Sequence, residues 1–207
     1  MIETLLTDFG NVLAEVRRSR TCAFLADISG LTAGEVCERI YSRDLEHASE
    51  TGQLDLDGHL AAVSEALGLG DEFPEQTFLQ AYWEGLSLIP ESVAALKSLR
   101  RADTPVYVLS NISPVHKEWF LSCEELEGSY DKAFFSCDMG VMKPDESAFR
   151  LAAEKIDSAP ERTLFLDDRE ENCEAAREAR FVAQLVTNPA AQVPEIVDRL
   201  LDELDRK

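Results

Sequence analysis

The sequence TLLTDFGNVL, residues 4–13, decides the fold. Its first four residues form a short, mostly apolar run, followed by an aspartate and a glycine-containing turn. This pattern predicts a strand that ends with a carboxylate at the edge of a sheet. Asp8 is therefore a candidate nucleophile. Two residues later stands Gly10, which has no ionisable group.

Composition limits the range of functions. The 207 residues include 40 acidic and 20 basic side chains, for a formal net charge of −20. This length suits one core domain with a small insert. The acidic excess argues against nucleic acid as a partner, because polyanions bind surfaces rich in cations. A small phosphorylated metabolite is still compatible, since a metal ion, one lysine and backbone N–H groups can form a local electropositive pocket.

The five cysteines are an odd number with no close C-x-x-C pair, so we expect neither a disulfide framework nor a zinc knuckle. No apolar run approaches the roughly 18 residues that span a bilayer, and no leader-like segment precedes the first strand. These features predict a cytoplasmic protein, without a membrane partner, that is a monomer or a homodimer.

Helical periodicity dominates the chain from residue 14 to residue 88. Apolar residues recur at spacings of three and four, glycines separate the segments, and no strand-like run interrupts them. We expect a small all-helical cap over residues 14–88, in which residues 45–52 form a polar loop between helices. The predicted helices cover residues 20–28, 32–43, 57–67 and 74–85.

Helices and strands alternate over the rest of the chain. This alternation predicts an α/β fold with a Rossmann-like, mainly parallel sheet flanked by helices, built from residues 1–13 and 89–207. Ligands of such sheets bind at the carboxyl ends of the strands. The predicted strands are 106–109, 133–136, 163–166 and 183–186, and the predicted helices are 90–101, 114–125, 145–156, 170–180 and 193–204.

Four of these strand ends or following loops carry candidate chemistry. They hold Asp8, the pair Ser110-Asn111, Lys143, and the pair Asp167-Asp168. Three carboxylates at one sheet edge would repel one another unless a hard divalent cation lay between them, and oxygen ligands of this type suit Mg²⁺. A phosphoryl group attacked by a carboxylate also needs a nearby cation and hydrogen-bond donors. Lys143 and the Ser-Asn pair could supply these.

Together these residues resemble the four motifs of the haloacid dehalogenase superfamily, and the resemblance covers nearly the whole chain. The helical insert is similar to the cap that this superfamily places between its first two motifs. The closest likeness is to the subgroup of bacterial sugar phosphatases and the N-terminal phosphatase domain of soluble epoxide hydrolase. Some members of this subgroup, among them a glucose-1-phosphatase, have glycine at the Gly10 position. The resemblance implies a magnesium-dependent phosphomonoester hydrolase that forms an aspartyl-phosphate.

The resemblance also implies a role for each motif residue. Asp8 would be the nucleophile and a metal ligand, and Gly10 would bind the metal through its carbonyl oxygen. Asp168 would coordinate Mg²⁺ directly and Asp167 through a water. The substrate phosphate would be bound by Ser110, Asn111 and Lys143, and Lys143 would also pair with Asp8.

Two positions depart from the family pattern. Gly10 replaces the aspartate that usually acts as general acid and base, and Arg180 stands where relatives often have glycine, which affects the end of a helix. His47 or Glu50, in the cap, could replace the missing acid. Arg17, with Arg18 and Arg20, could reach an anionic substrate. The sequence assigns no role to His59 or His116.

Three alternatives compete with phosphatase activity. A dehalogenase also lacks an acid at the Gly10 position but needs no metal, which the Asp167-Asp168 pair argues against. A phosphonatase would need a lysine from the cap, and residues 14–88 contain none. The third alternative is a non-catalytic phosphate-binding or interaction protein that kept the site and lost turnover with its acid.

Overall fold

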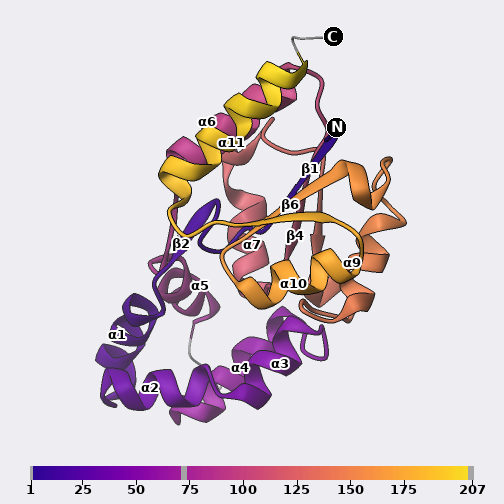
Figure 1. Cartoon of the computed structure of the whole chain (residues 1–207). Coiled ribbons are helices and arrows are strands. Elements are labelled where there is room, and N and C mark those ends of the chain that lie inside the picture. Colours follow the sequence, from indigo (N-terminus) through magenta and orange to yellow (C-terminus); the bar gives the residue numbers. More distant parts are fainter. Residues whose placement is uncertain (1, 71–73, 205–207) are drawn as a thin grey trace.

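The computed structural model describes residues 2–70 and 74–204. Its centre is a parallel sheet of five strands in the order β5-β4-β1-β6-β7, flanked by helices (Figure 1). This confirms the predicted α/β fold. The first strand of the chain lies in the middle because β4 and β6 pair with its two edges. The strands are β1 (Thr4–Thr7), β4 (Val106–Ser110), β5 (Lys132–Phe135), β6 (Thr163–Asp167) and β7 (Val182–Leu185).

Helices cover both faces of the sheet. Successive residues of a strand point to opposite faces, so Leu5 and Leu6 are both fully buried but belong to different core clusters. Leu5 packs with α6 (Pro90–Arg101), α7 (Pro114–Ser122) and α11 (Pro189–Leu204), and Leu6 packs with α9 (Glu146–Ala153) and α10 (Glu170–Glu178). The remaining short elements are α8 (Ser136–Met139), η1 (Glu124–Leu126) and η2 (Pro160–Arg162).

A second group of helices lies beyond the carboxyl ends of the strands, at the bottom of Figure 1. These helices form a separate hydrophobic cluster, which includes Leu25, Val36, Val63 and Tyr82 and also Val115 of α7. They are α1 (Arg18–Ser29), α2 (Ala33–Ile40), α3 (Arg43–Glu50), α4 (Leu56–Leu67) and α5 (Glu75–Trp83).

The prediction of an all-helical insert is wrong at its two ends. Residues Ala14–Val16 form strand β2 and residues Leu86–Leu88 form strand β3, and the two pair antiparallel, with Ala14 opposite Leu88. The chain leaves the five-stranded sheet through β2 and returns to it through β3. These two connecting segments lie side by side and share backbone hydrogen bonds. The division at residues 13 and 89 remains a prediction, and residues 1 and 205–207 of the predicted core lie outside the described residues.

The prediction of a loop over residues 45–52 is also wrong, because residues 43–50 form helix α3. Its sequence is polar but consists mainly of good helix formers. Ser49 is buried, whereas His47 is exposed, so only a narrow face of α3 packs inward. The helix predicted over residues 32–43 corresponds to α2, which ends three residues earlier, at Ile40, and α3 follows it.

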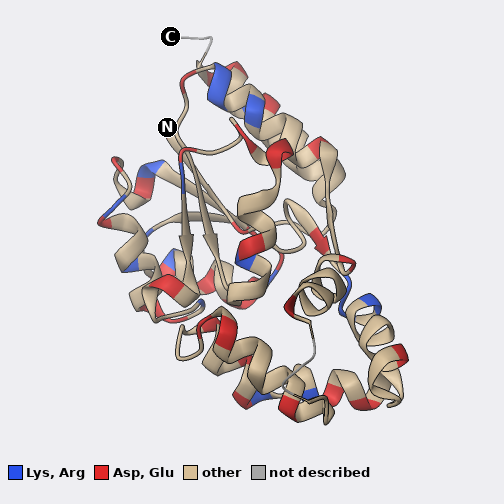
Figure 2. Ribbon diagram, turned by 180° about the vertical axis from the view of Figure 1, so that it is seen from behind, with Lys and Arg blue, Asp and Glu red and all other residues tan. Residues whose placement is uncertain are grey.

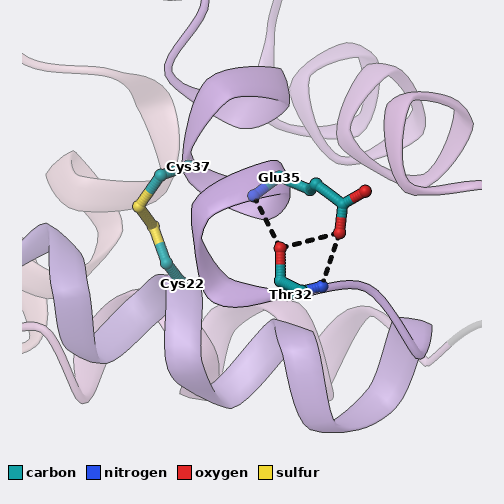
Figure 3. Close-up of a disulfide and its surroundings, with 4 residues drawn as sticks. All are labelled: Cys22, Thr32, Glu35 and Cys37. Carbon is teal, nitrogen blue, oxygen red and sulfur yellow. Dashed lines mark hydrogen bonds between the residues drawn. A yellow bond between two sulfur atoms is a disulfide. The ribbon is translucent and has the colours of Figure 1, made fainter.

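One disulfide joins the first two helices, between Cys22 of α1 and Cys37 of α2 (Figure 3). This corrects the expectation drawn from cysteine spacing. The residues are 15 apart in sequence, but the turn between the helices brings their Cα atoms to 5.4 Å. A capping box between Thr32 and Glu35 begins α2 and holds this turn (Figure 3). Cys123, Cys137 and Cys173 are free.

Most of the other elements agree with the sequence to within a few residues. Helix α11 begins four residues before the predicted start, because the Gln192 side chain accepts hydrogen bonds from the backbone of Thr187 and Asn188 and caps an earlier turn. Within residues 2–70 and 74–204, no helix has both the length and the apolar character needed to cross a membrane.

Candidate functional site

The parallel sheet brings the candidate residues to one edge. Asp8 follows β1, the central strand. Ser110 is the last residue of β4 and Asp167 is the last residue of β6, and these two strands lie on either side of β1. A cavity of about 740 Å³ lies between this edge and helices α1–α5. From the sheet side it is lined by Asp8, Gly10, Ser110, Asn111, Lys143, Asp168, Arg169 and Asn172, among others.

A buried lysine lies between two buried carboxylates. Lys143 Nζ is 3.0 Å from Asp8 Oδ1 and 2.6 Å from Asp167 Oδ2, and the lysine is 1% exposed. Burial alone would lower the pKa of Lys143, but the two carboxylates outweigh this effect and raise it. Lys143 is therefore charged at neutral pH. Acidic side chains are spread over the helices of both parts of the molecule (Figure 2). Lys143, in contrast, is the only buried side chain among the lysines and arginines that the structure describes.

The Asp8 carboxylate accepts a hydrogen bond from the backbone N–H of Phe9 at 2.7 Å. Burial raises the pKa of Asp8 to about 7, and the neighbouring Asp167 adds to this, while Lys143 opposes it. A metal cation at the site would act in the same direction as Lys143 and lower the pKa of Asp8. Asp8 would then stay ionised, as a nucleophile needs to be.

The carboxylates fit a divalent metal ion. One oxygen each from Asp8, Asp167 and Asp168 lie within 4.8 Å of one another. These three acids face a single buried lysine, so a cation is needed to balance their charge. Asn172 Oδ1, which is buried and lines the cavity, has no hydrogen-bond partner among the described residues. Oxygen donors of this kind suit Mg²⁺.

Asp167 and Asp168, at the end of β6 and just after it, differ in burial and in the number of hydrogen bonds that their carboxylates accept. Asp167 is fully buried, and its oxygens already accept hydrogen bonds from Lys143, from the backbone of Arg169 and from the Asn172 side chain. Asp168 is partly exposed and accepts one hydrogen bond, from Asn11. More of the Asp168 carboxylate is therefore free to contact a metal, and its direct coordination of Mg²⁺ stays a prediction.

The side chain of Asn111 is committed to the backbone of Lys143. Its Nδ2 donates to Lys143 O at 2.7 Å, and its Oδ1 accepts from Lys143 N at 2.8 Å. This places Asn111 as a clamp on the lysine loop, and its predicted contact with phosphate stays a prediction. Ser110 is buried at the cavity wall, where its hydroxyl has only a long contact, 3.4 Å, with Asn111 O.

Two of the three cap residues predicted to reach the site, His47 and Glu50, line the cavity, and Arg17 does not. His47 and Glu50 both belong to α3. Arg17 pairs with Glu15, and its neighbour Arg18 lines the cavity instead. Arg18 marks the start of α1, and adjacent residues on a helix point in different directions.

Three residues at the cavity wall were missed in the sequence. Tyr82, His59 and His116 come from α5, α4 and α7, and the two histidines each have a ring centroid 5.3 Å from that of Tyr82. His59 follows the periodicity of the buried Leu60 and Val63, which could have marked it as an inward-facing polar residue. Nothing local in the sequence connects it with Tyr82 or His116.

Known proteins are similar to this chain in sequence and in fold. A family model described as haloacid dehalogenase-like hydrolase matches residues 2–180. D-ribitol-5-phosphate phosphatase from Bacteroides thetaiotaomicron is 25% identical over 190 residues, which cover 87% of this chain and 90% of that protein. A haloacid dehalogenase family enzyme from the same bacterium, solved with magnesium and inorganic phosphate, has a TM-score of 0.79 and 24% identity over 89% of this chain and 94% of that one.

A third relative is a haloacid dehalogenase-like hydrolase from Porphyromonas gingivalis. Its structure has a TM-score of 0.83 and 26% identity, and the match covers 97% of this chain and 98% of the relative. The family match extends over all four strand-end positions, including Asp8 and Asp168. The chain belongs to the haloacid dehalogenase-like hydrolase family.

Proposed function

We propose that this protein is a magnesium-dependent phosphatase of small phosphorylated metabolites that forms an aspartyl-phosphate on Asp8. The observation that carries the proposal is the cluster of three carboxylates around the buried Lys143, open to a cavity. Phosphatases among the relatives, and a related structure that contains magnesium and inorganic phosphate, support the same reaction class.

The first step makes one bond and breaks one. An Asp8 oxygen attacks phosphorus, the bond from phosphorus to the ester oxygen breaks, and the alcohol leaves after gaining a proton. Water then attacks the aspartyl-phosphate, which releases inorganic phosphate and restores Asp8. Lys143 offsets negative charge on Asp8 and the phosphoryl group. Mg²⁺, held by Asp8, the Gly10 carbonyl and Asp168, would supply further charge neutralisation when bound.

Helices α1–α5 would act as a cap that closes this cavity. Gly52, just after α3, has a φ of +70°, and a Cβ at this position would overlap the carbonyl oxygen of Cys137 in the core. Helix α3 also contacts α8. This close approach supports a cap whose α3 end is seated on the core, with its side chains directed at the site.

Glu50 is the cap group that we propose as the proton donor in place of the absent acid at Gly10. It lines the same cavity as Asp8. Attack in line by Asp8 places the leaving oxygen on the opposite side of phosphorus, where cap residues lie. Burial raises the pKa of Glu50 to about 7, and the like charge of Glu46 adds to this. The cations Arg18, Arg169 and Lys143 oppose the rise. A carboxyl group with this pKa holds a proton in slightly acidic solution and can donate it.

The test is phosphate release from p-nitrophenyl phosphate, with Mg²⁺ and with excess EDTA. Turnover should need Mg²⁺. Asp8→Asn should abolish it, and Lys143→Ala should nearly do so, while Asp138→Asn, at the surface pair with Lys117, serves as the matched control. Full activity in EDTA or in Asp8→Asn would refute the proposal.

The same samples decide between the alternatives. Halide release from 2-chloropropionate without metal would identify a dehalogenase. Binding of inorganic phosphate without turnover of any ester would identify a non-catalytic binder.

A further inference from the structure

A second group of polar residues lies at the cavity wall on the cap side, apart from the carboxylate cluster. Tyr82 is 1% exposed and His59 is 3% exposed, and both line the cavity. Tyr82 lies centrally, with the rings of His59, His116 and Tyr41 packed edge-on around it at centroid distances of 5.3, 5.3 and 6.4 Å. Because α4 and α5 pack against α7 here, the cluster joins the cap to the core.

Three polar atoms of this cluster have no hydrogen-bond partner among the described residues. They are the hydroxyls of Tyr41 and Tyr82 and the Nε2 atom of His59, and all three are buried. The other ring nitrogen of His59, Nδ1, is 2.7 Å from Ser49 Oγ, and His116 Nδ1 is 3.0 Å from Ser113 Oγ. Buried polar groups in folded proteins nearly always have partners, and an unpaired one is costly. A hydrogen-bonding group that enters the cavity at this wall would give these atoms partners.

The cluster is uncharged at neutral pH. Burial lowers the pKa of His59 to about 4 and that of His116 to about 3, and burial raises the pKa of Tyr82 well above its usual value. Arg18, at the start of α1, pairs with Glu46, and its guanidinium carbon lies 4.5 Å from the centre of the Tyr41 ring. Tyr82, His59 and His116 themselves offer a ligand no charged partner, whereas a hydroxyl group can both donate and accept hydrogen bonds.

We infer that Tyr82, His59 and His116 form a second subsite, which holds an uncharged, hydroxyl-bearing alcohol portion of the phosphate ester. This inference rests on the proposed function, because it assigns the leaving-group end of the same cavity. It predicts that polyol and sugar phosphates are preferred over alkyl phosphates of equal length and over esters with a carboxylate. A site built to bond a hydroxyl discriminates strongly against a ligand that lacks it, since the buried partners are then left unpaired.

The test compares three four-carbon esters, namely erythritol 4-phosphate, butyl phosphate and erythronate 4-phosphate, by kcat/KM. The wild type should prefer the first. Tyr82→Phe, which removes only the hydroxyl, should lower the ratio of erythritol 4-phosphate to butyl phosphate about tenfold, the size expected for one buried hydrogen bond. His59→Asn, which can keep a bond to Ser49 and loses Nε2, should act in the same direction. Tyr130→Phe, a tyrosine outside the cavity lining, is the matched control.

The outcomes separate this inference from the proposed function. If p-nitrophenyl phosphate is hydrolysed but Tyr82→Phe and His59→Asn leave the ratio unchanged, the subsite is refuted and the phosphatase stands. A preference for the carboxylate ester would likewise refute an uncharged subsite. If no ester is hydrolysed, the proposed function fails, and the subsite is judged by binding of erythritol 4-phosphate, which Tyr82→Phe should weaken about tenfold and Tyr130→Phe should not. Equal binding to wild type and Tyr82→Phe would then refute it.

Discussion

The side chain of Asn111 holds the backbone of Lys143 through two hydrogen bonds, one donated to Lys143 O at 2.7 Å and one accepted from Lys143 N at 2.8 Å. The two residues are 32 positions apart in sequence. The clamp links the end of β4 to the loop before α9, and so fixes the lysine whose Nζ lies between Asp8 and Asp167.

Asn111→Ala should lower kcat more than it changes KM. The amide would no longer position Lys143, and loss of about 1 to 3 kcal/mol from two hydrogen bonds corresponds to roughly 5- to 150-fold. Asn111→Asp, which keeps only the acceptor, should be intermediate. Steady-state kinetics with p-nitrophenyl phosphate measure both constants. A rise in KM at constant kcat would instead indicate that Asn111 binds the phosphate directly.

The turnover rate of an alkyl phosphate should fall at alkaline pH in the wild type, and Glu50→Gln should abolish this fall. The pKa of Glu50 is raised to about 7, so the wild-type group is protonated below this pH and loses its proton above it. Turnover of an alkyl phosphate should therefore fall as the pH rises through about 7. In Glu50→Gln the rate below pH 7 should drop roughly 10²-fold and lose this dependence.

An aryl phosphate provides the control for this experiment, because its leaving group needs no proton. Its profile should be nearly the same in wild type and Glu50→Gln. A basic limb near pH 7 that persists for the alkyl ester in Glu50→Gln would exclude Glu50 as the acid. His47→Ala, changed on the same helix, then tests the other candidate.

Gly10→Asp should rescue Glu50→Gln. A Cβ at residue 10 would meet only Val16 Cγ2, at 3.4 Å, which is an ordinary van der Waals contact, so the structure has room for the added side chain at its base. In single-turnover experiments with esters of graded leaving-group pKa, Glu50→Gln should show a steep dependence and the double variant a shallow one. A shallow dependence in Glu50→Gln alone would mean that another group supplies the proton.

Arg180→Gly should stabilise the fold. Arg180 follows α10 with a φ of 72°, and the next residue, Phe181, donates its N–H to Ala176 O, which is the pattern of a Schellman cap. Glycine adopts this conformation without the cost of a Cβ, about 1 kcal/mol. Arg180→Ala is the control, because it also loses the exposed ion pair with Glu161 and keeps the Cβ. Urea unfolding at neutral pH should rank the glycine variant above the alanine variant, and the reverse order would contradict the cap.

Replacing Cys22 and Cys37 together by alanine should lower the free energy of unfolding by up to about 3 kcal/mol, the chain-entropy value for a loop of 15 residues. Thermal unfolding of the wild type with and without a reductant should show the same loss. Cys123→Ala, a free cysteine, is the control. If reductant leaves the wild-type midpoint unchanged, the bond does not contribute to stability.

Local patterns in the sequence predicted much of this protein. The apolar run before Asp8 and the later alternation of strands and helices indicated a parallel sheet, because buried strands and amphipathic helices differ in period. Such a sheet places all its carboxyl ends at one edge, so Asp8, Ser110 and Asp167 could be expected to meet before any coordinates were known. Helix α6, Pro90–Arg101, has the predicted bounds because its starting proline and its periodicity are both local signals.

Tertiary structure alone decided which side chains meet across the cavity. The pairing of β2 with β3, the disulfide between Cys22 and Cys37, the clamp of Asn111 on Lys143 and the cluster around Tyr82 all join residues that are distant in sequence. No periodicity encodes such contacts, because they depend on how whole helices pack. The sequence by itself determined the sheet and the order of the reactive groups along its edge. Packing of the helical segment determined that Arg18, rather than Arg17, lines the cavity with His47 and Glu50, and that the Tyr82 hydroxyl and His59 Nε2 have no hydrogen-bond partner among the described residues.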